Sequence, residues 1–599
     1  MGTVMKLVVP HTGEFELSDA RLVRLSESLG ISHVGVFLDK ETRSYAEYIE
    51  SALPIDRSCF VVNPRVIRDW TQGILPAALV RCLLSRCEHL LVYGLTLDPF
   101  CEELIRAFSS GLLLGQRIAD TGQFYEIDSD SRDVCGAFSG LSFGPASPLN
   151  DRILHVNTDK GDVRRPIRIG GGPFMALIKL DRAEILFLAS ADVFDVDDEF
   201  GDRPLSEVFS RFVAQVMALR YIFGEECWRP CGHHASLIID DPLLQPRYGY
   251  LDFRSLLRLM KECNFAATIS FIPHNYRRNS EATVEMFRQS GGRLAICFHG
   301  NDHTAAELAS KDTSRLNTIL RIAEARMEAH ANATGLHCPK IMVFPQDDFS
   351  VEAMKVLKSR NFCAAVGGTA DPAGHRANLT LGEKAQPAIL RHGKFPLFLR
   401  KFIGRVKKQD IAFSLFFGQP VLVTEHHGLF GHVESLVEDV LMINSIEPDI
   451  EWCDLETAVL KATLRRRKPD RVCHIRAYSR VVQIANDWDS PGRFLVEWSH
   501  SSECPPIEQV LQGCVPTHSL VVDDSTIRVS VELPPHSCQT ISVVYQNNYS
   551  SLEGLGFLWG PKAFIRRRLS EARDNYISKN QFATAVAQAL TRRIFSKIL

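Results

Sequence analysis

Short apolar runs alternate with amphipathic stretches through the first 228 residues. The runs KLVVP, HVGVFL, CFVV and HLLVYGL have the length and β-branched content of buried strands. Helical stretches such as ARLVRLSESLG and PAALVRCLLSRC lie between them. Because alternating strands and helices indicate a parallel sheet covered by helices, we expect residues 1–228 to form a doubly wound α/β domain.

A second series of strands and helices begins at residue 236. Its apolar runs are SLIID, AATISFIP, RLAICF, IMVF, CAAV and PVLVTE, and helical patterns such as FRSLLRLMKECN and VEAMKVLKSRN separate them. Such a series favours a closed or nearly closed β/α barrel, which places its chemistry at the carboxyl ends of the strands. The sequence therefore predicts a distorted β/α barrel over residues 229–468.

The pattern changes again after residue 468. Short alternating strands such as VVQIAND, RFLVEWS and IRVSVEL, separated by turn residues, predict a β-sandwich over 469–548. The tail, 549–599, has a helical pattern and carries nine Lys or Arg but only two acidic residues from Pro561 onward. We expect peripheral contact of this tail with an anionic membrane surface, or packing of its helix on the sandwich or on a second subunit.

The composition indicates a cellular compartment and argues against one class of partner. The 68 Lys and Arg are balanced by 71 Asp and Glu, so the chain has no general attraction for nucleic acid. Its 16 Cys are irregularly spaced and include no CxxC pair, which is typical of buried thiols in a reducing compartment. The first residues become polar before a secretory segment could form, so we expect a cytoplasmic protein, peripheral to the inner face of the membrane if the tail binds there.

Three groups of polar residues follow predicted barrel strands. Asp240 and Asp241 end SLII, His299 and His303 follow RLAICF, and the pair His426-His427 follows VLVTE. If the segment after RLAICF turns helically, its two His lie on one face and can share one ion. One Asp and two His leave a metal coordination position open for water, which is the catalytic arrangement.

These segments resemble the motifs of the polysaccharide deacetylases. SLIIDD at 236–241 is similar to their first motif, and HGNDHT at 299–304 is similar to their His-Ser/Thr-x-x-His motif, with Gly300 in place of the hydroxyl residue. VLVTEHH at 421–427 is similar to their late strand, which ends in a catalytic His. The resemblance implies a metal-dependent hydrolase that removes acetyl groups from N-acetylated amino sugars of a polysaccharide or glycan precursor.

The resemblance also implies a role for each residue. Asp240 would be the general base, and His426 or His427 would be the general acid. Asp241, His299 and His303 would hold a divalent ion, which we expect to be zinc. Segment VFPQDD at 343–348 stands where the family has an Arg-containing motif, but it has no Arg. Arg391 is one candidate for orienting the base, and a surface arginine is the alternative.

Two other functions compete with this one. The departures from the family motifs are compatible with a glycan-binding or scaffolding protein whose barrel has lost activity. A serine hydrolase is the second alternative, because Gly140–Gly144 matches GxSxG around Ser142. That motif requires a tight turn from a strand into a helix, and the flanking sequence CGAFSGLSFGPASP predicts no helix.

Overall fold

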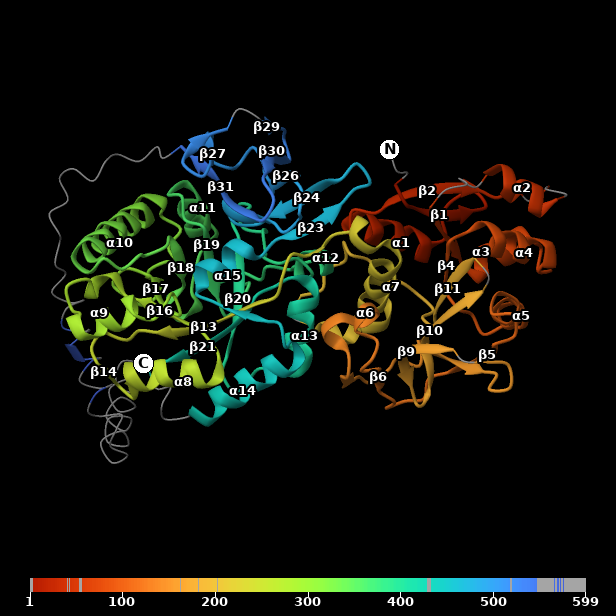
Figure 1. The fold of residues 1–599 in the computed structure, drawn as a ribbon, viewed down its shortest axis with the longest axis horizontal. Coiled ribbons are helices and arrows are strands. Elements are labelled where there is room, and N and C mark those ends of the chain that lie inside the picture. Colours follow the sequence, from red (N-terminus) through yellow and green to blue (C-terminus); the bar gives the residue numbers. More distant parts are fainter. Residues whose placement is uncertain are drawn as a thin grey trace.

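The computed structural model describes residues 4–546, except 40, 42–43, 53–56, 162, 181, 202, 428–432 and 518–519, and residues 565, 568–569, 571 and 575 near the C-terminus. Figure 1 shows an N-terminal α/β part at one end, a barrel surrounded by helices at the other, and a β-sandwich above the barrel. The predicted multidomain α/β class is therefore confirmed. The chosen boundaries at 228, 468 and 548 stay a prediction.

The N-terminal part is built on one nine-stranded sheet in the order β2-β1-β3-β4-β11-β10-β9-β6-β7. Its parallel half contains β1 (Lys6–His11), β2 (Ser32–Phe37), β3 (Ser58–Val62), β4 (His89–Val92) and β11 (Ala183–Leu188). The other half is antiparallel and contains β6 (Tyr125–Ile127), β7 (Ser142–Phe143), β9 (Arg164–Ile169) and β10 (Gly172–Leu180). The sheet is thus mixed, with the doubly wound pattern confined to its parallel half.

The barrel consists of seven parallel strands. In chain order they are β13 (His234–Asp240), β16 (Ala267–Phe271), β17 (Leu294–His299), β18 (Ile341–Val343), β19 (Ala364–Gly367), β20 (Leu397–Phe402) and β21 (Val421–His426). Each strand pairs with the next, and β13 pairs with both β16 and β21, which closes the ring. Strand β20 was not among the predicted strands.

Small and branched side chains fill the interior of the barrel. Ile238, Cys297, Val343, Val366 and Leu422 belong to one buried cluster. Successive residues of a strand point to opposite faces, so residues two positions apart face the same way. Asp240 and His299 lie two positions after the inward residues Ile238 and Cys297, and Arg400 lies two positions after the buried Phe398, so all three face the interior. Polar side chains from several strands are thereby brought to the mouth formed by the carboxyl ends.

A two-sheet sandwich follows the barrel. One sheet has the order β12-β23-β24-β26-β30-β29 and the other β25-β31-β27-β28. These strands include β24 (Val472–Ala477), β25 (Val481–Asn486), β26 (Gly492–Ser499), β27 (Ile507–Gln512), β28 (Val515–Pro516), β29 (Leu520–Val522), β30 (Thr526–Leu533) and β31 (Ser537–Tyr545). The first includes β12 (Arg229–Pro230), which precedes the barrel and pairs antiparallel with β23 (Leu464–Arg467). The strands that face each other bury Val482, Val496, Val529 and Val543 in a core of their own.

The predicted membrane-binding tail lies almost wholly outside the described residues. Two of its described residues contact the barrel: Glu571 forms an ion pair of 2.6 Å with Arg278, and the side-chain oxygen of Asn575 accepts a hydrogen bond from the backbone of Gly249. Among the described helices, none combines the length and apolar character that crossing a bilayer requires.

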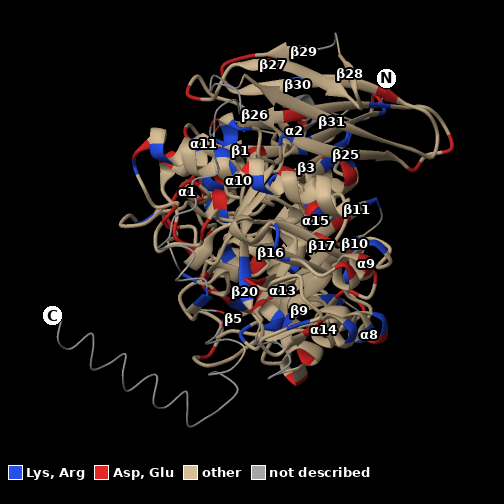
Figure 2. Cartoon of the chain, turned by 90° about the vertical axis from the view of Figure 1, so that its left-hand side faces the viewer, with Lys and Arg blue, Asp and Glu red and all other residues tan. Residues whose placement is uncertain are grey.

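Basic and acidic residues are interspersed along the elements drawn in Figure 2. Most of the cysteines are buried or half-buried, but Cys514 and Cys538 are exposed. No disulfide joins any of the cysteines, and all of them lie in the described part of the chain.

Candidate metal centre at the barrel mouth

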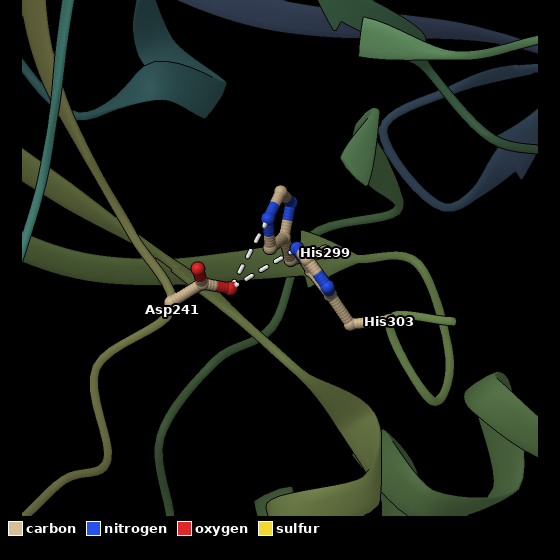
Figure 3. A group of neighbouring side chains, drawn as sticks. All are labelled: Asp241, His299 and His303. Atoms are coloured by element: carbon tan, nitrogen blue, oxygen red, sulfur yellow. Dashed lines mark ion pairs between the residues drawn. The ribbon is translucent and has the colours of Figure 1, made fainter. Parts of the chain in front are cut away.

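Asp241, His299 and His303 meet at the carboxyl ends of β13 and β17. Asp241 Oδ1 lies 3.5 Å from Nε2 of His299 and 3.3 Å from Nε2 of His303 (Figure 3). One ligand atom from each residue lies within 4.8 Å of the other two. In the described part of the chain, these residues form a group of His and Asp side chains that could hold a metal ion together. The structure brings together the three residues that the sequence proposed as ligands.

The donor atoms fit a zinc-like ion in chemistry and spacing. Bonds of about 2.1 Å at a tetrahedral angle place two donor atoms about 3.4 Å apart, which agrees with the 3.3 and 3.5 Å separations from Asp241. Two imidazole nitrogens and one carboxylate oxygen are the set that Zn²⁺ binds in hydrolytic sites. The residues present therefore fit a divalent ion with one open coordination position.

The backbone orients His299 for this role. Its Nδ1 lies 2.9 Å from the carbonyl oxygen of Val343 on the neighbouring strand β18. A carbonyl can only accept, so Nδ1 carries the proton and the lone pair of Nε2 points toward Asp241. Such a hydrogen bond behind a ligating His fixes both its tautomer and its ring orientation.

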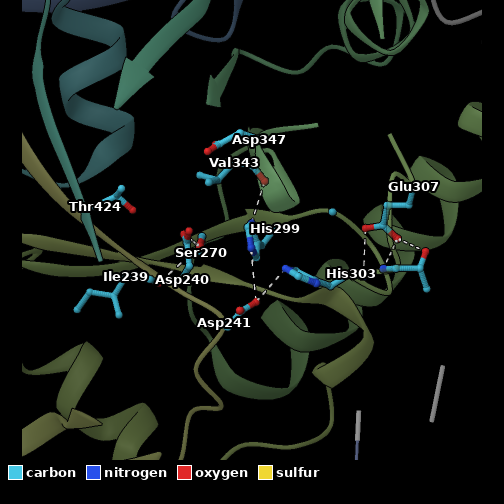
Figure 4. A network of polar contacts seen from close by, with 12 residues as sticks. Ile239, Asp240, Asp241, Ser270, His299, His303, Glu307, Val343, Asp347 and Thr424 are labelled. Carbon is cyan, nitrogen blue, oxygen red and sulfur yellow. Dashed lines mark hydrogen bonds and ion pairs between the residues drawn. The ribbon is translucent and has the colours of Figure 1, made fainter. Parts of the chain in front are cut away.

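The loop that carries His303 is built around Glu307. The buried Glu307 carboxylate accepts hydrogen bonds from the backbone N–H groups of residues 301–304, at 2.8, 3.1, 3.1 and 3.4 Å (Figure 4). The helical turn expected here does not form, because His303 has φ 52° and the loop curls around the carboxylate instead. A Cβ at Gly300 would clash with Glu307 and come 2.6 Å from Pro345 Cγ, which explains the glycine at this position.

Replacing Glu307 by Gln is expected to weaken metal binding about 10- to 100-fold, as loss of an outer partner of a metal ligand does elsewhere. The amide keeps the size of the side chain but brings N–H groups toward the N–H donors of the loop. Zinc titration by calorimetry would measure the change. Glu281→Gln, on an exposed part of the barrel, is the matched control. Equal zinc affinity in Glu307→Gln and the control would contradict this role.

Asp240 lies beside the three residues but in a different environment. Its buried carboxylate faces Arg400 Nη1 at 2.9 and 2.7 Å and accepts a hydrogen bond from the Ser270 hydroxyl. Burial raises the pKa of Asp240, but the charge of Arg400, the charge of His299 and the Ser270 hydrogen bond together outweigh burial, and the pKa falls to about 2. Asp240 is therefore an ionised carboxylate at neutral pH, next to the candidate metal ligands.

Arg400, from the unpredicted strand β20, orients this carboxylate. It lies inside the barrel and also contacts Asp347 Oδ1 at 3.1 Å, and that oxygen accepts a hydrogen bond from the backbone N–H of Gly368. Arg391, the candidate from the sequence, is wrong for this role, because it instead contacts the Asn378 carbonyl and the Glu383 carboxylate. The segment VFPQDD stands where the polysaccharide deacetylase motif has an arginine. Here it contributes Asp347, which forms an ion pair with Arg400.

Replacing Arg400 by Met is expected to lower the melting temperature strongly, since removing one partner of a buried ion pair costs about 3–5 kcal/mol. The cost arises from the Asp240 charge left without compensation. The double variant Asp240→Asn/Arg400→Met should therefore melt at a higher temperature than Arg400→Met alone. A double variant that melts below the single variant would refute this account of the pair.

The two late histidines lie in different surroundings. In the pairing of β13 with β21, Asp240 is the partner of His426, so both side chains belong to the same face of the barrel wall. The His426 ring is exposed at the mouth and stacks on Phe402, with ring centroids 5.9 Å apart. His427 instead packs edge-on against Tyr248, 5.1 Å between centroids. The geometry thus separates two residues that the sequence left equivalent.

Ser142 does not lie on a nucleophile elbow. It belongs to the two-residue strand β7, which pairs with β6 at the edge of the N-terminal sheet. The following residues, 144–151, form no helix. The serine hydrolase alternative therefore lacks the strand-turn-helix geometry that its motif requires.

No family model and no curated protein matches the sequence. Among solved structures, the carbohydrate deacetylase Agd3 is similar, with 9% identity, a TM-score of 0.45, and coverage of 91% of this chain and 99% of that one.

Family 4 carbohydrate esterases are similar over a shorter span. The Streptomyces lividans enzyme, in complex with acetate, has 13% identity, a TM-score of 0.23, and coverage of 38% of this chain and 92% of its own. The Bacillus anthracis enzyme has 14% identity, a TM-score of 0.24, and coverage of 38% and 84%. At these values the function has to be argued from the site itself.

Proposed function

We propose that the barrel is a metal-dependent deacetylase acting on N-acetylated amino sugars of a polysaccharide or glycan precursor. The observation that carries the proposal is the pairing of two sites at one mouth: three residues suited to hold a divalent ion, and a buried carboxylate kept ionised beside them. Amide hydrolysis at neutral pH needs both an electrophilic centre for the carbonyl and a base for water.

Asp241, His299 and His303 would hold the ion. A divalent ion bound there supplies Lewis acidity, which polarises the acetyl carbonyl and makes water more acidic. Asp240 receives the proton of the attacking water, and Arg400 and Ser270 fix the carboxylate in position. Because its lone pairs are partly engaged by Arg400, the orientation of Asp240 is set before substrate binds.

We assign the general acid to His426. Its place opposite Asp240 in the strand pairing and its exposure at the mouth allow it to give a proton to the departing amine nitrogen. His426→Ala should lower kcat about 100-fold or more with unchanged zinc content, while His427→Ala, the matched control, should change kcat far less. Steady-state kinetics with metal analysis would measure both variants. A larger loss of kcat in His427→Ala would reverse the assignment.

Acetate release from a panel of N-acetylated and O-acetylated glycans tests the function directly. We expect release from N-acetylated amino-sugar oligomers, its loss on treatment with a chelator, and its return on adding zinc. Faster release from O-acetylated glycans would replace the amide substrate by an ester. Binding of glycan without any acetate release would favour the glycan-binding or scaffolding alternative.

A further inference from the structure

A cavity distinct from the candidate metal centre lies where the N-terminal part, the barrel and the sandwich meet. Its volume is about 370 Å³, and residues of the α6 and η1 segment (132–138), of α13 (Lys408–Phe417) and of β23 line it. Figure 1 shows α6, α13 and β23 at this junction. His233, which lines the cavity, immediately precedes β13, whereas Asp240 ends that strand. At about 3.3 Å per residue, the cavity lies roughly 20 Å from the candidate metal centre, at the opposite end of the barrel.

Arginine dominates the lining. Six arginines and two carboxylates, Asp133 and Glu225, face the cavity; the arginines are Arg132, Arg220, Arg229, Arg465, Arg466 and Arg467. Asp133 pairs with Arg164, which is outside the lining, and Glu225 lies 3.9 Å from Arg467. Arg132 forms an ion pair of 2.6 Å with the buried Glu447, which also contacts His233. The other five arginines of the lining still outnumber the nearby carboxylates, so the cavity has a net positive charge.

Arg220 is the most deeply placed of these arginines. It is 7% exposed, donates to the Phe416 carbonyl, and lies over the Phe416 ring at 4.6 Å. Its buried Nε has no hydrogen-bond partner among the described residues. Burial lowers the pKa of Arg220 to about 10, since no described carboxylate compensates its charge. A buried guanidinium in this state gains free energy from a bound anion.

Two neighbouring arginines also donate to backbone carbonyls, although the Glu497 charge acts on one of them, Arg466. Arg229 donates to the carbonyls of Gly224 and Arg220, and Arg466 donates to the Gly30 carbonyl, so both bind neutral acceptors. The buried Nε of Arg466 also has no partner among the described residues. Arg465 lies next to Arg466 on β23 and pairs across the sheet with Arg229. Arginines from α7 (Ala214–Phe223), from β12 and from β23 thus line one cavity.

We propose that this cavity binds a small phosphorylated molecule carrying at least two negative charges. Planar guanidinium forks match phosphate oxygens in pairs, which favours phosphate over a single carboxylate. A volume of about 370 Å³ suits a small molecule and not a long polymer. Because its walls come from three parts of the chain and the metal centre is distant, the ligand is not the glycan substrate, and its binding holds these parts together.

Inorganic pyrophosphate is the probe, used with the full-length protein. We expect a saturable rise in melting temperature of about 3 °C or more over sodium chloride of equal ionic strength. Arg465→Gln/Arg467→Gln should bind pyrophosphate at least tenfold more weakly by calorimetry. This pair lies toward the open side of the cavity and leaves buried Arg220 in place. Arg258→Gln, on the barrel helix α8 (Phe253–Cys263), is the matched control and should bind normally.

Three outcomes would overturn the proposal. One is the absence of saturable pyrophosphate binding by the wild-type protein. The second is equal affinity in Arg465→Gln/Arg467→Gln and the control. The third is that a polyuronate binds more tightly than pyrophosphate and that the double variant abolishes this polyuronate binding. That result would assign the cavity to an acidic polymer. None of these measurements depends on deacetylase activity, so the result is independent of the function proposed for the barrel.

Discussion

Asp240→Asn is expected to lower kcat by about 100-fold or more while the protein still binds a full equivalent of zinc. The amide has nearly the shape of the carboxylate but cannot take a proton from water. The three residues proposed to hold the ion are unchanged. Acetate release and metal content, measured on the same preparation, would test the two halves of this expectation together.

The neighbouring Ser270 offers a control for Asp240→Asn. Ser270→Ala removes one hydrogen bond to the Asp240 carboxylate but leaves its charge and the Arg400 contact intact. Its kcat should fall much less than that of Asp240→Asn. Normal turnover by Asp240→Asn on an acetylated substrate would exclude Asp240 as the base.

Asp241→Ala and His299→Ala are expected to abolish both stoichiometric zinc binding and acetate release. Each change removes one of three donors, and the two that remain cannot enclose the ion. Metal analysis after dialysis, together with activity assays at increasing zinc concentration, would detect the loss. The exposed His337→Ala is a histidine control, since His337 pairs with Glu456 on the surface. Full zinc occupancy in Asp241→Ala would refute the ligand set.

Much of the barrel could be predicted from sequence because its strands are apolar on both faces and end at polar residues. The prediction missed β20, although four of the six residues of LFLRKF are apolar, because Arg400 and Lys401 interrupt the run. Arg400 is inside the barrel only because Asp240 and Asp347 neutralise it. Such compensation between residues more than fifty positions apart leaves no trace in local periodicity.

The local structure around His299 and His303 could not be predicted from the sequence either. His299 and His303 do lie together beside Asp241, but the spacing suggested a helical turn where a loop around Glu307 forms. Glu307 is one carboxylate among many, and only its burial beneath four backbone N–H groups reveals its role. Gly300 was the one local sign of this loop in the sequence. It stands where the family motif has a hydroxyl residue, because Glu307 occupies the space that a larger side chain would need.

The short pairing of β12 with β23 also bears on how this architecture could have been assembled. Pro230 and Leu464 are partners in adjacent antiparallel strands, so the chain enters and leaves the barrel at one place. Neighbouring entry and exit points are what allow one folded unit to be inserted into a loop of another. Residues 231–463 can thus be regarded as a guest module within a host sheet, and the host would need only a short turn between Pro230 and Leu464 if the guest were removed.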